Sequence, residues 1–111
     1  MAFSYKITVF TPTYNRAYIL ENLYRSLQRQ SFTDFEWLVV DDGSSDGTKA
    51  LFERWQQEDN PFPIRYCYKE NGGKCRAINY GLKLAQGELF FTVDSDDYLT
   101  DDALEKVAIW E

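Results

Sequence analysis

Residues 90–97, Phe90-Phe91-Thr92-Val93-Asp94-Ser95-Asp96-Asp97, join a short apolar run directly to three carboxylates. The aromatic and β-branched residues, entered through a glycine, predict a buried strand. Carboxylates at the carboxyl end of a strand lie where open α/β sheets bind ligands. Because the three acids repel one another unless a cation shares the site, a hard divalent ion, Mg²⁺ or Mn²⁺, is the natural candidate. We therefore predict a metal–phosphate site here.

Outward from this stretch, strand-like segments alternate with helical segments along the chain. Strands are predicted at residues 6–10, 35–40, 64–68 and 88–93, and helices at residues 17–29, 46–58, 74–85 and 100–110. This βαβαβαβα order predicts an α/β fold, a mostly parallel, Rossmann-like sheet flanked by helices. We expect one domain over residues 1–111 with right-handed crossovers.

Single residues predict where several of these segments begin, end or face. Pro12 cannot donate to a central ladder, so the first strand is expected to end before it. Asn15 is a plausible cap for the first helix, and Gly87 suits the end of the third. In the third helix, Ile78 and Leu82 are expected on the inward face with the small residues between and after them.

Composition and charge exclude several classes of protein. The chain is 44% hydrophobic and 17% aromatic, which is ample for a core and unlike a disordered segment. Its net charge of −6 argues against non-specific binding to nucleic acid or to an anionic membrane surface. Cys67 and Cys75 form no metal-ligand pair and there is no histidine, so we expect no structural zinc and reduced thiols. With no signal peptide before Lys6 and no bilayer-length apolar run, we expect a soluble, cytoplasmic chain.

Four loops that follow predicted strands carry polar residues, and the carboxyl ends of parallel strands meet at one edge. The loops are residues 11–16, 41–48, 71–74 and 94–97. Each loop allows two interpretations. Tyr14 can pack on the first helix or stack on a base; Asp41 and Asp42 can cap the second helix or accept hydrogen bonds from a base or ribose. The glycines before Lys74 form either a plain turn or a close approach to phosphate, without a P-loop pattern. The acids at 94–97 are either a solvated turn or a metal site.

These blocks, in this order, resemble the family 2 glycosyltransferases, whose nucleotide-sugar-binding fold is called GT-A. The similar segments are Phe10-Thr11-Pro12-Thr13-Tyr14-Asn15-Arg16, residues 30–36, residues 40–48, Asn71-Gly72-Gly73-Lys74 with the helix after it, and the aspartate–any–aspartate motif at Asp94-Ser95-Asp96-Asp97. The likeness covers nearly the whole chain. Any one block is moderate evidence, but five at compatible spacing are strong.

The resemblance implies a role for each matching residue. Pro12, Tyr14 and Asp42 would line the base pocket, with Asp42 accepting from uracil, while Asp41 supports the loop. The implied nucleotide-sugar-binding set is Pro12, Tyr14, Arg16, Asp41, Asp42, Lys74, Asp94 and Asp96, with Lys74 near the base or diphosphate. The implied metal ligands are Asp94, Asp96 and Asp97, and which of the three touches the ion stays open.

The resemblance also implies a reaction: transfer of a sugar, with inversion, from a nucleotide-diphospho-sugar, UDP-sugar favoured, to an acceptor glycan or lipid-linked glycan. A metal would neutralise the leaving diphosphate and a carboxylate base would deprotonate the acceptor. Because that base lies in the family's acceptor half, we expect it beyond Glu111. The chain is thus interpreted as the amino-terminal donor-binding part of a longer enzyme, which could work at the cytoplasmic face of the membrane. The exposed edge of its last strand should favour self-association.

Other classes of protein match less well. Ser45-Asp46-Gly47-Thr48 is similar to a haloacid-dehalogenase nucleophile loop, but Ser44 stands where the nucleophilic aspartate is needed. A sugar nucleotidylyltransferase expects a glycine-rich first loop, and residues 11–16 contain no glycine. A nucleotide-binding module without turnover is the open alternative, and sugar transfer or donor hydrolysis would distinguish it.

Overall fold

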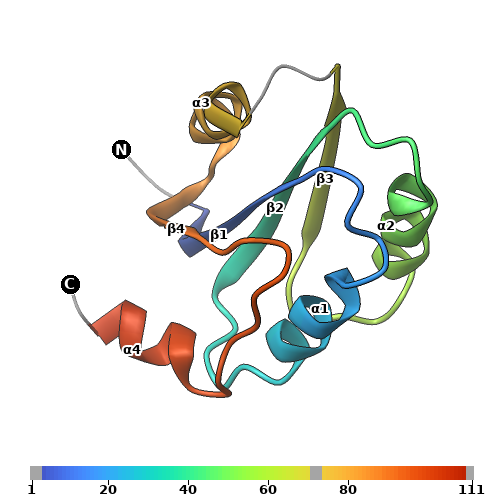
Figure 1. Ribbon diagram of the computed structural model, residues 1–111. Coiled ribbons are helices and arrows are strands. Elements are labelled where there is room, and N and C mark those ends of the chain that lie inside the picture. The colour runs from blue at the N-terminus through green and yellow to red at the C-terminus, as the bar shows by residue number, and fades with distance from the viewer. Residues whose placement is uncertain (1–3, 71–73, 110–111) are drawn as a thin grey trace.

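The computed structural model describes residues 4–70 and 74–109, and for residues 74–77 it describes the backbone only. The elements are β1 (Tyr5–Thr13), α1 (Leu20–Gln28), β2 (Phe35–Asp42), α2 (Thr48–Gln56), β3 (Ile64–Lys69), α3 (Lys74–Leu84), β4 (Gly87–Thr92) and α4 (Ala103–Ile109). The strands pair in parallel in the order β3-β2-β1-β4 (Figure 1). The predicted parallel α/β sheet is confirmed. None of the described helices has the length and apolar character of a bilayer span.

The pleat of β1 and β2 divides the core into two layers. Side chains such as Val9 and Trp37 pack against α1, α2 and α4, whereas Phe10 and Leu38 pack against α3 on the opposite face. Figure 1 shows the same division, with α3 on one side of the sheet and α1 and α2 on the other. Period-two alternation of this kind fixes the face to which each strand residue points.

Charge is buried on the α3 face in a single satisfied network. Glu36 is fully buried on β2 and accepts hydrogen bonds from the Thr8 hydroxyl and from the Gln86 backbone N–H, each at 2.7 Å. Arg65 on β3 completes the network with an ion pair to Glu36 at 2.8 Å. A buried carboxylate persists when it is paired and hydrogen-bonded in this way, and here it joins three strands to the turn before β4.

The first strand was expected to end before Pro12, and this expectation is wrong. β1 continues to Thr13, and Pro12 lies opposite Val40. The carbonyl of Phe10 accepts from Val93 N–H, so the polar backbone groups of Phe10 point toward β4. Pro12, two residues later, points to the same side, where β4 has already ended at Thr92. No ladder bond is therefore lost when proline occupies this position.

Two expectations about α3 are also corrected. Gly87 does not end the helix but begins β4, and its φ is outside the left-handed region. A Cβ there would lie 2.3 Å from the backbone nitrogen of Thr8, so glycine is needed for the close approach of the two strands. Leu82 is 52% exposed instead of inward, because α3 meets the sheet through Gly81, whose added Cβ would lie 2.2 Å from the ring of Phe10.

The remaining boundaries differ from prediction by up to three residues at an end, since helix termini are the least certain part of a periodicity argument. α1 begins at Leu20, three residues later than expected, and α4 begins at Ala103. Of the three residues expected on the inward face of α2, Phe52 and Trp55 are fully buried, whereas Leu51 is only partly buried against the same core.

Candidate functional site

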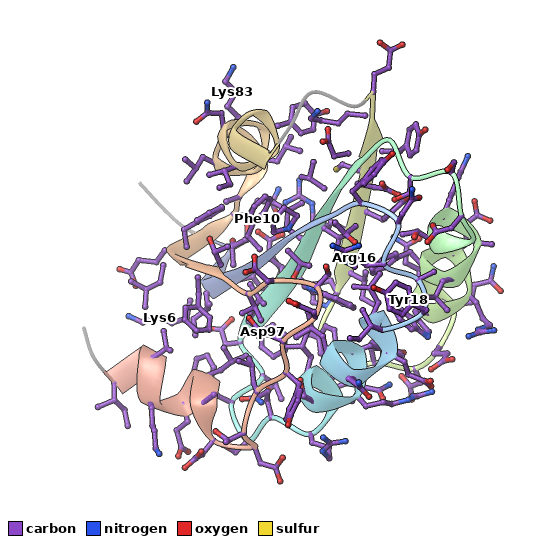
Figure 2. All side chains as sticks on the ribbon, in the orientation of Figure 1. Lys6, Phe10, Arg16, Tyr18, Lys83 and Asp97 are labelled. Carbon is purple, nitrogen blue, oxygen red and sulfur yellow. The ribbon has the colours of Figure 1, made fainter. Side chains whose placement is uncertain are left out.

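A cavity of about 300 Å³ opens at the carboxyl edge of the sheet. Its lining consists of Pro12, Thr13, Tyr14, Arg16, Asp42, Asp94, Ser95 and Asp96. The cavity gathers residues from the end of β1 and the loop after it, from the end of β2 and from the loop after β4. This is expected because the carboxyl ends of parallel strands meet at one edge of the sheet. Figure 2 shows Arg16 on the loop after β1 and Asp97 on the loop after β4. Sequence reasoning missed Thr13 and Ser95, whose types carry no special signal.

The loop after β4 gathers three carboxylates. One oxygen from each of Asp94, Asp96 and Asp97 lies within 4.8 Å of the other two. Asp94 is half-buried and the other two are exposed, and the backbone N–H of Asp97 donates to the Asp94 carbonyl at 3.0 Å. All-oxygen donors this close together suit a hard divalent cation, so these residues fit the predicted metal. Asp97 joins the cluster without lining the cavity itself.

Pleating separates the two adjacent acids at the end of β2. Asp41 is fully buried and accepts from Ser44 N–H at 2.9 Å and from the Tyr66 hydroxyl. Burial raises the pKa of Tyr66, and the Asp41 carboxylate raises it further, so this hydroxyl stays a neutral donor. Asp41 therefore holds the loop and does not line the cavity, whereas Asp42 points to the other face and does line it.

Asp42 forms an ion pair that sequence reasoning did not anticipate. Its Oδ1 lies 2.7 Å from Nζ of Lys69, the last residue of β3, which also donates to the Glu70 carbonyl at 2.9 Å. Asp42 and Lys69 are register partners at the ends of neighbouring strands. This register could have predicted the ion pair from the sequence, but only if the strand order had been known beforehand.

Asn15 joins the two loops beside the cavity and does not cap α1, whose N-cap residue is Ile19. Its Oδ1 accepts from the backbone N–H groups of Ser45 at 2.8 Å and Asp46 at 3.3 Å. Its own N–H donates to Ser44 Oγ at 2.8 Å. Asn15 has a φ of 52°, in the left-handed region that asparagine tolerates better than most residues.

Asp46 adds a reciprocal contact between the same two loops. Its carboxylate accepts from Ala17 N–H at 3.2 Å and from Thr48 N–H at 3.0 Å. Desolvation is the largest single effect and raises its pKa, but the hydrogen bonds from Thr48 and Ala17 together outweigh it and hold the pKa below its usual value. α2 begins at Thr48, with Gly47 as its N-cap residue, two residues later than the helix start expected at Asp46.

Of the remaining predicted site residues, the structure describes the side chains of Tyr14 and Arg16 but not that of Lys74. Tyr14 is 45% exposed and lines the cavity, an arrangement unlike packing on α1. Arg16 is exposed and makes no ion pair within the described part of the chain. Lys74 begins α3, but its side chain, like residues 71–73 before it, lies outside the described residues.

Comparison with known proteins gives consistent matches. The family model described as "Glycosyl transferase family 2" matches residues 8–108. The chain is 40% identical over 103 residues to the GalNAc(5)-diNAcBac-PP-undecaprenol beta-1,3-glucosyltransferase of Campylobacter jejuni, covering 89% of this chain and 32% of that protein. It is 37% identical over 105 residues to the poly(ribitol-phosphate) beta-N-acetylglucosaminyltransferase TarS of Staphylococcus aureus, covering 93% of this chain and 18% of TarS. The chain thus spans a third or less of these relatives.

Solved structures agree. A TarS fragment in complex with UDP superposes with a TM-score of 0.85 at 35% identity, covering 95% of this chain and 31% of that one. The mannosyltransferase PcManGT of Pyrobaculum calidifontis, in complex with GDP-Man and Mn²⁺, gives a TM-score of 0.82 at 29% identity and covers 96% of this chain and 31% of its own. These neighbours have the GT-A fold, as predicted, and the phosphatase and nucleotidylyltransferase alternatives fall away. The chain belongs to glycosyl transferase family 2.

Proposed function

We propose that this chain binds a nucleotide-diphospho-sugar, with UDP-sugar favoured, together with a divalent metal ion. The observation that carries the proposal is one cavity bounded by Asp42 and by Asp94 and Asp96 of the acid cluster. The first carboxylate suits a base that offers N–H groups, and the cluster suits a metal-bound diphosphate.

The base end of the cavity supports a uracil ring. Pro12 and Tyr14 supply apolar surface beside Asp42, and an aromatic face can stack on a base. Uracil carries a ring N–H that a carboxylate accepts. The structures of TarS with UDP and with UDP-GlcNAc are 35% and 36% identical in sequence to this chain. This similarity supports a uridine nucleotide as the ligand of this chain.

The acid cluster supports a divalent ion, and its oxygen donors suit Mg²⁺ and Mn²⁺ alike. PcManGT was solved with Mn²⁺ beside its nucleotide sugar. When bound, such an ion supplies Lewis-acid neutralisation of charge on the diphosphate. Asp94, Asp96 and Asp97 would hold it, and Arg16 adds a positive charge at the same cavity.

For the whole protein we propose transfer of the sugar to a hydroxyl of an acceptor glycan, lipid-linked glycans included, with inversion at the anomeric carbon. The residues of this chain bind and orient the donor. The general base is assigned beyond Glu111, to the larger part of the relatives' length that this chain does not match.

Calorimetric titration of UDP with and without Mn²⁺ tests the proposal. Wild-type protein should bind UDP in a Mn²⁺-dependent manner, EDTA should abolish that dependence, and Asp96→Ala should lose it. Asp59→Ala, which removes an exposed acid near the end of α2, is the matched control and should bind like wild type. A folded wild-type chain that binds no UDP, or an Asp96→Ala variant with unchanged metal dependence, would contradict the proposal. Donor hydrolysis by the longer protein separates the enzyme from a nucleotide-binding module without turnover.

A further inference from the structure

We propose that the hydroxyl of Thr13, at the end of β1, hydrogen-bonds the nucleoside part of the bound nucleotide. This hydroxyl serves the ligand and not the fold. The inference rests on the proposed function and deepens it, since it adds a binding residue to the same cavity.

Three buried threonines lie on β1, and two of their hydroxyls have partners within the protein. Thr8 Oγ1 donates to Glu36 Oε2 at 2.7 Å. Thr11 Oγ1 accepts from Trp37 Nε1 at 3.0 Å. Thr13 is only 4% exposed, yet its Oγ1 has no hydrogen-bond partner among the residues that the structure describes.

An unpaired buried hydroxyl works against folding. Removing it from water costs free energy that a hydrogen bond normally returns, so such groups are uncommon in folded proteins and call for an explanation. In the described part of the chain, one other buried side-chain atom is in this condition, Nε1 of Trp55, whose ring stacks on Tyr24 and does not line the cavity. Thr13 does line the cavity, where a ligand can supply the missing partner.

The polar neighbour of Thr13 on the next strand is occupied elsewhere. Asp41 is the register partner of Thr13 on β2. Its Oδ1 accepts from Ser44 N–H at 2.9 Å, and its Oδ2 accepts from the Tyr66 hydroxyl. Asp41 thus holds the loop after β2 and contacts β3, and the hydroxyl of Thr13 stays available to a ligand.

Rotation of the Thr13 side chain can bring its hydroxyl to the cavity. The oxygen is buried in the free protein, although the residue lines the cavity. A threonine carries its hydroxyl and its methyl group on the same carbon, so a change of χ1 rotamer exchanges their positions. This rotation breaks no hydrogen bond to the described residues, and it moves the methyl group into the place that offers no polar partner.

The position of Thr13 assigns the contact to the nucleoside and not to the diphosphate. Thr13 lies between Pro12 and Tyr14, which together with Asp42 form the base end of the cavity. The acid cluster comes instead from the loop after β4. Because a hydroxyl both donates and accepts, it suits the carbonyl and N–H groups of a base as well as the hydroxyls of a ribose.

The test combines calorimetric titration of UDP, in the presence of Mn²⁺, with urea unfolding of the free protein. Thr13→Val replaces the hydroxyl by a methyl group of similar size. It should weaken UDP binding by about threefold to tenfold, the range for one lost hydrogen bond, and leave the urea midpoint unchanged or higher. Thr13→Ser keeps the hydroxyl and loses the methyl group, so it should bind UDP within about twofold of wild type but unfold at a lower urea concentration.

Thr11→Val is the matched control, because it makes the same change two residues earlier on the same face of β1. Thr11 does not line the cavity, and its hydroxyl pairs with Trp37 Nε1. Thr11→Val should therefore unfold at a lower urea concentration, while the folded variant binds UDP as wild type does. If Thr11→Val does not fold, the contrast between Thr13→Val and Thr13→Ser decides the matter.

UMP locates the contact within the nucleotide, because UMP keeps the whole nucleoside and lacks the second phosphate. Thr13→Val should weaken UMP binding, measured by competition with UDP, by about the same factor as UDP binding. A loss confined to UDP would place the contact at the diphosphate and contradict the assignment.

Two further results would overturn the inference alone. The first is an unchanged UDP affinity in Thr13→Val. The second is a lower urea midpoint in Thr13→Val, or failure of this variant to fold, which would show that the hydroxyl supports the fold, as it would through an ordered water. A folded wild type that binds no UDP would instead contradict the proposed function.

Discussion

Asn15 is the residue on which the two loops beside the cavity depend. It accepts from two backbone N–H groups of the second loop and donates its own N–H to Ser44 Oγ. It does so from a left-handed backbone conformation, with φ at 52°. Strain of this kind persists where the surroundings over-determine it. Side chain and backbone therefore both matter at this position.

Replacing Asn15 by alanine should destabilise the chain by about 1–3 kcal/mol. The substitution removes the Oδ1 acceptor, and alanine, which has a Cβ but no polar side chain, is strained at a positive φ. Asn15→Gly is the matched control: it loses the same hydrogen bonds but tolerates the backbone, so it should lose about 1 kcal/mol less. Urea unfolding measures both. Equal losses in the two variants would show that the left-handed conformation contributes nothing.

At the residue scale, the sequence predicts which residues gather at the sheet edge but not every role within the set. Pro12, Tyr14, Arg16, Asp42, Asp94 and Asp96 were all expected near one another, and all line one cavity. The expected role of Asn15 was wrong, because its partners lie 30 residues away on another loop. Lys69 was overlooked because its importance depends on strand register. Long-range pairing of this kind is not encoded in local pattern.

At the scale of elements, α1 and α2 are joined by the aromatic side chain and hydroxyl of Tyr24. Its ring stacks on Trp55 with centroids 4.2 Å apart, and the hydroxyl lies 2.8 Å from both Glu58 Oε1 and Asn60 Oδ1. Burial, and next the hydrogen bond to Glu58, raise the pKa of Tyr24 to about 12. A raised pKa means that the folded protein favours the neutral hydroxyl.

Tyr24→Phe should therefore show that the Tyr24 hydroxyl contributes to stability in a way that depends on pH in the alkaline range. In the unfolded protein this hydroxyl loses its proton near pH 10, whereas in the folded protein it does so at about 12. The stabilisation is therefore complete below pH 10 and declines as pH rises to about 12. The difference in free energy of unfolding between wild type and Tyr24→Phe should narrow across this window. Tyr18→Phe, at a 79% exposed side chain, is the control and should show no such narrowing. A Tyr24→Phe difference that stays constant from pH 9 to 12 would contradict the assignment.

The close contact between β1 and β4 limits the size of the side chain that position 87 can carry. Gly87→Ala would place a Cβ 2.3 Å from Thr8 N and 2.5 Å from the Ile7 carbonyl carbon, both backbone atoms that cannot turn away. We expect a loss of about 2–3 kcal/mol in urea unfolding. Gly47→Ala, where nothing lies within 4 Å of the added Cβ, should lose less than about 1 kcal/mol. Comparable losses in both variants would mean that β4 shifts easily.

For the molecule as a whole, the alternating strand and helix patterns sufficed to predict a parallel sheet with helices on its two faces. The order β3-β2-β1-β4 was not predicted, because crossover handedness and short loops do not choose between neighbours. That order leaves β4 at an edge of the sheet within the described residues.

An edge strand with apolar side chains favours association between copies. We expect sedimentation velocity at high protein concentration to show dimers or larger species, despite a net charge of −6. Thr92→Lys adds a charge to exposed residue 92 of β4 and should shift the profile toward monomer. Gln57→Lys makes the same charge change on the exposed end of α2 and is the matched control. A monomeric wild type at every concentration would contradict the prediction.

The bridge through Asn15 has a consequence for the thermodynamics of ligand capture. Because its backbone and side chain both bond to the second loop, the segment that carries Tyr14 and Arg16 and the segment around Ser44 are restrained together before any ligand arrives. Ordering loose segments on binding reduces affinity through lost conformational entropy. A nucleotide entering this cavity meets one pre-ordered rim in place of two independent ones, so its binding should show a smaller entropic penalty than in Asn15→Gly, at nearly the same enthalpy of contact with the base.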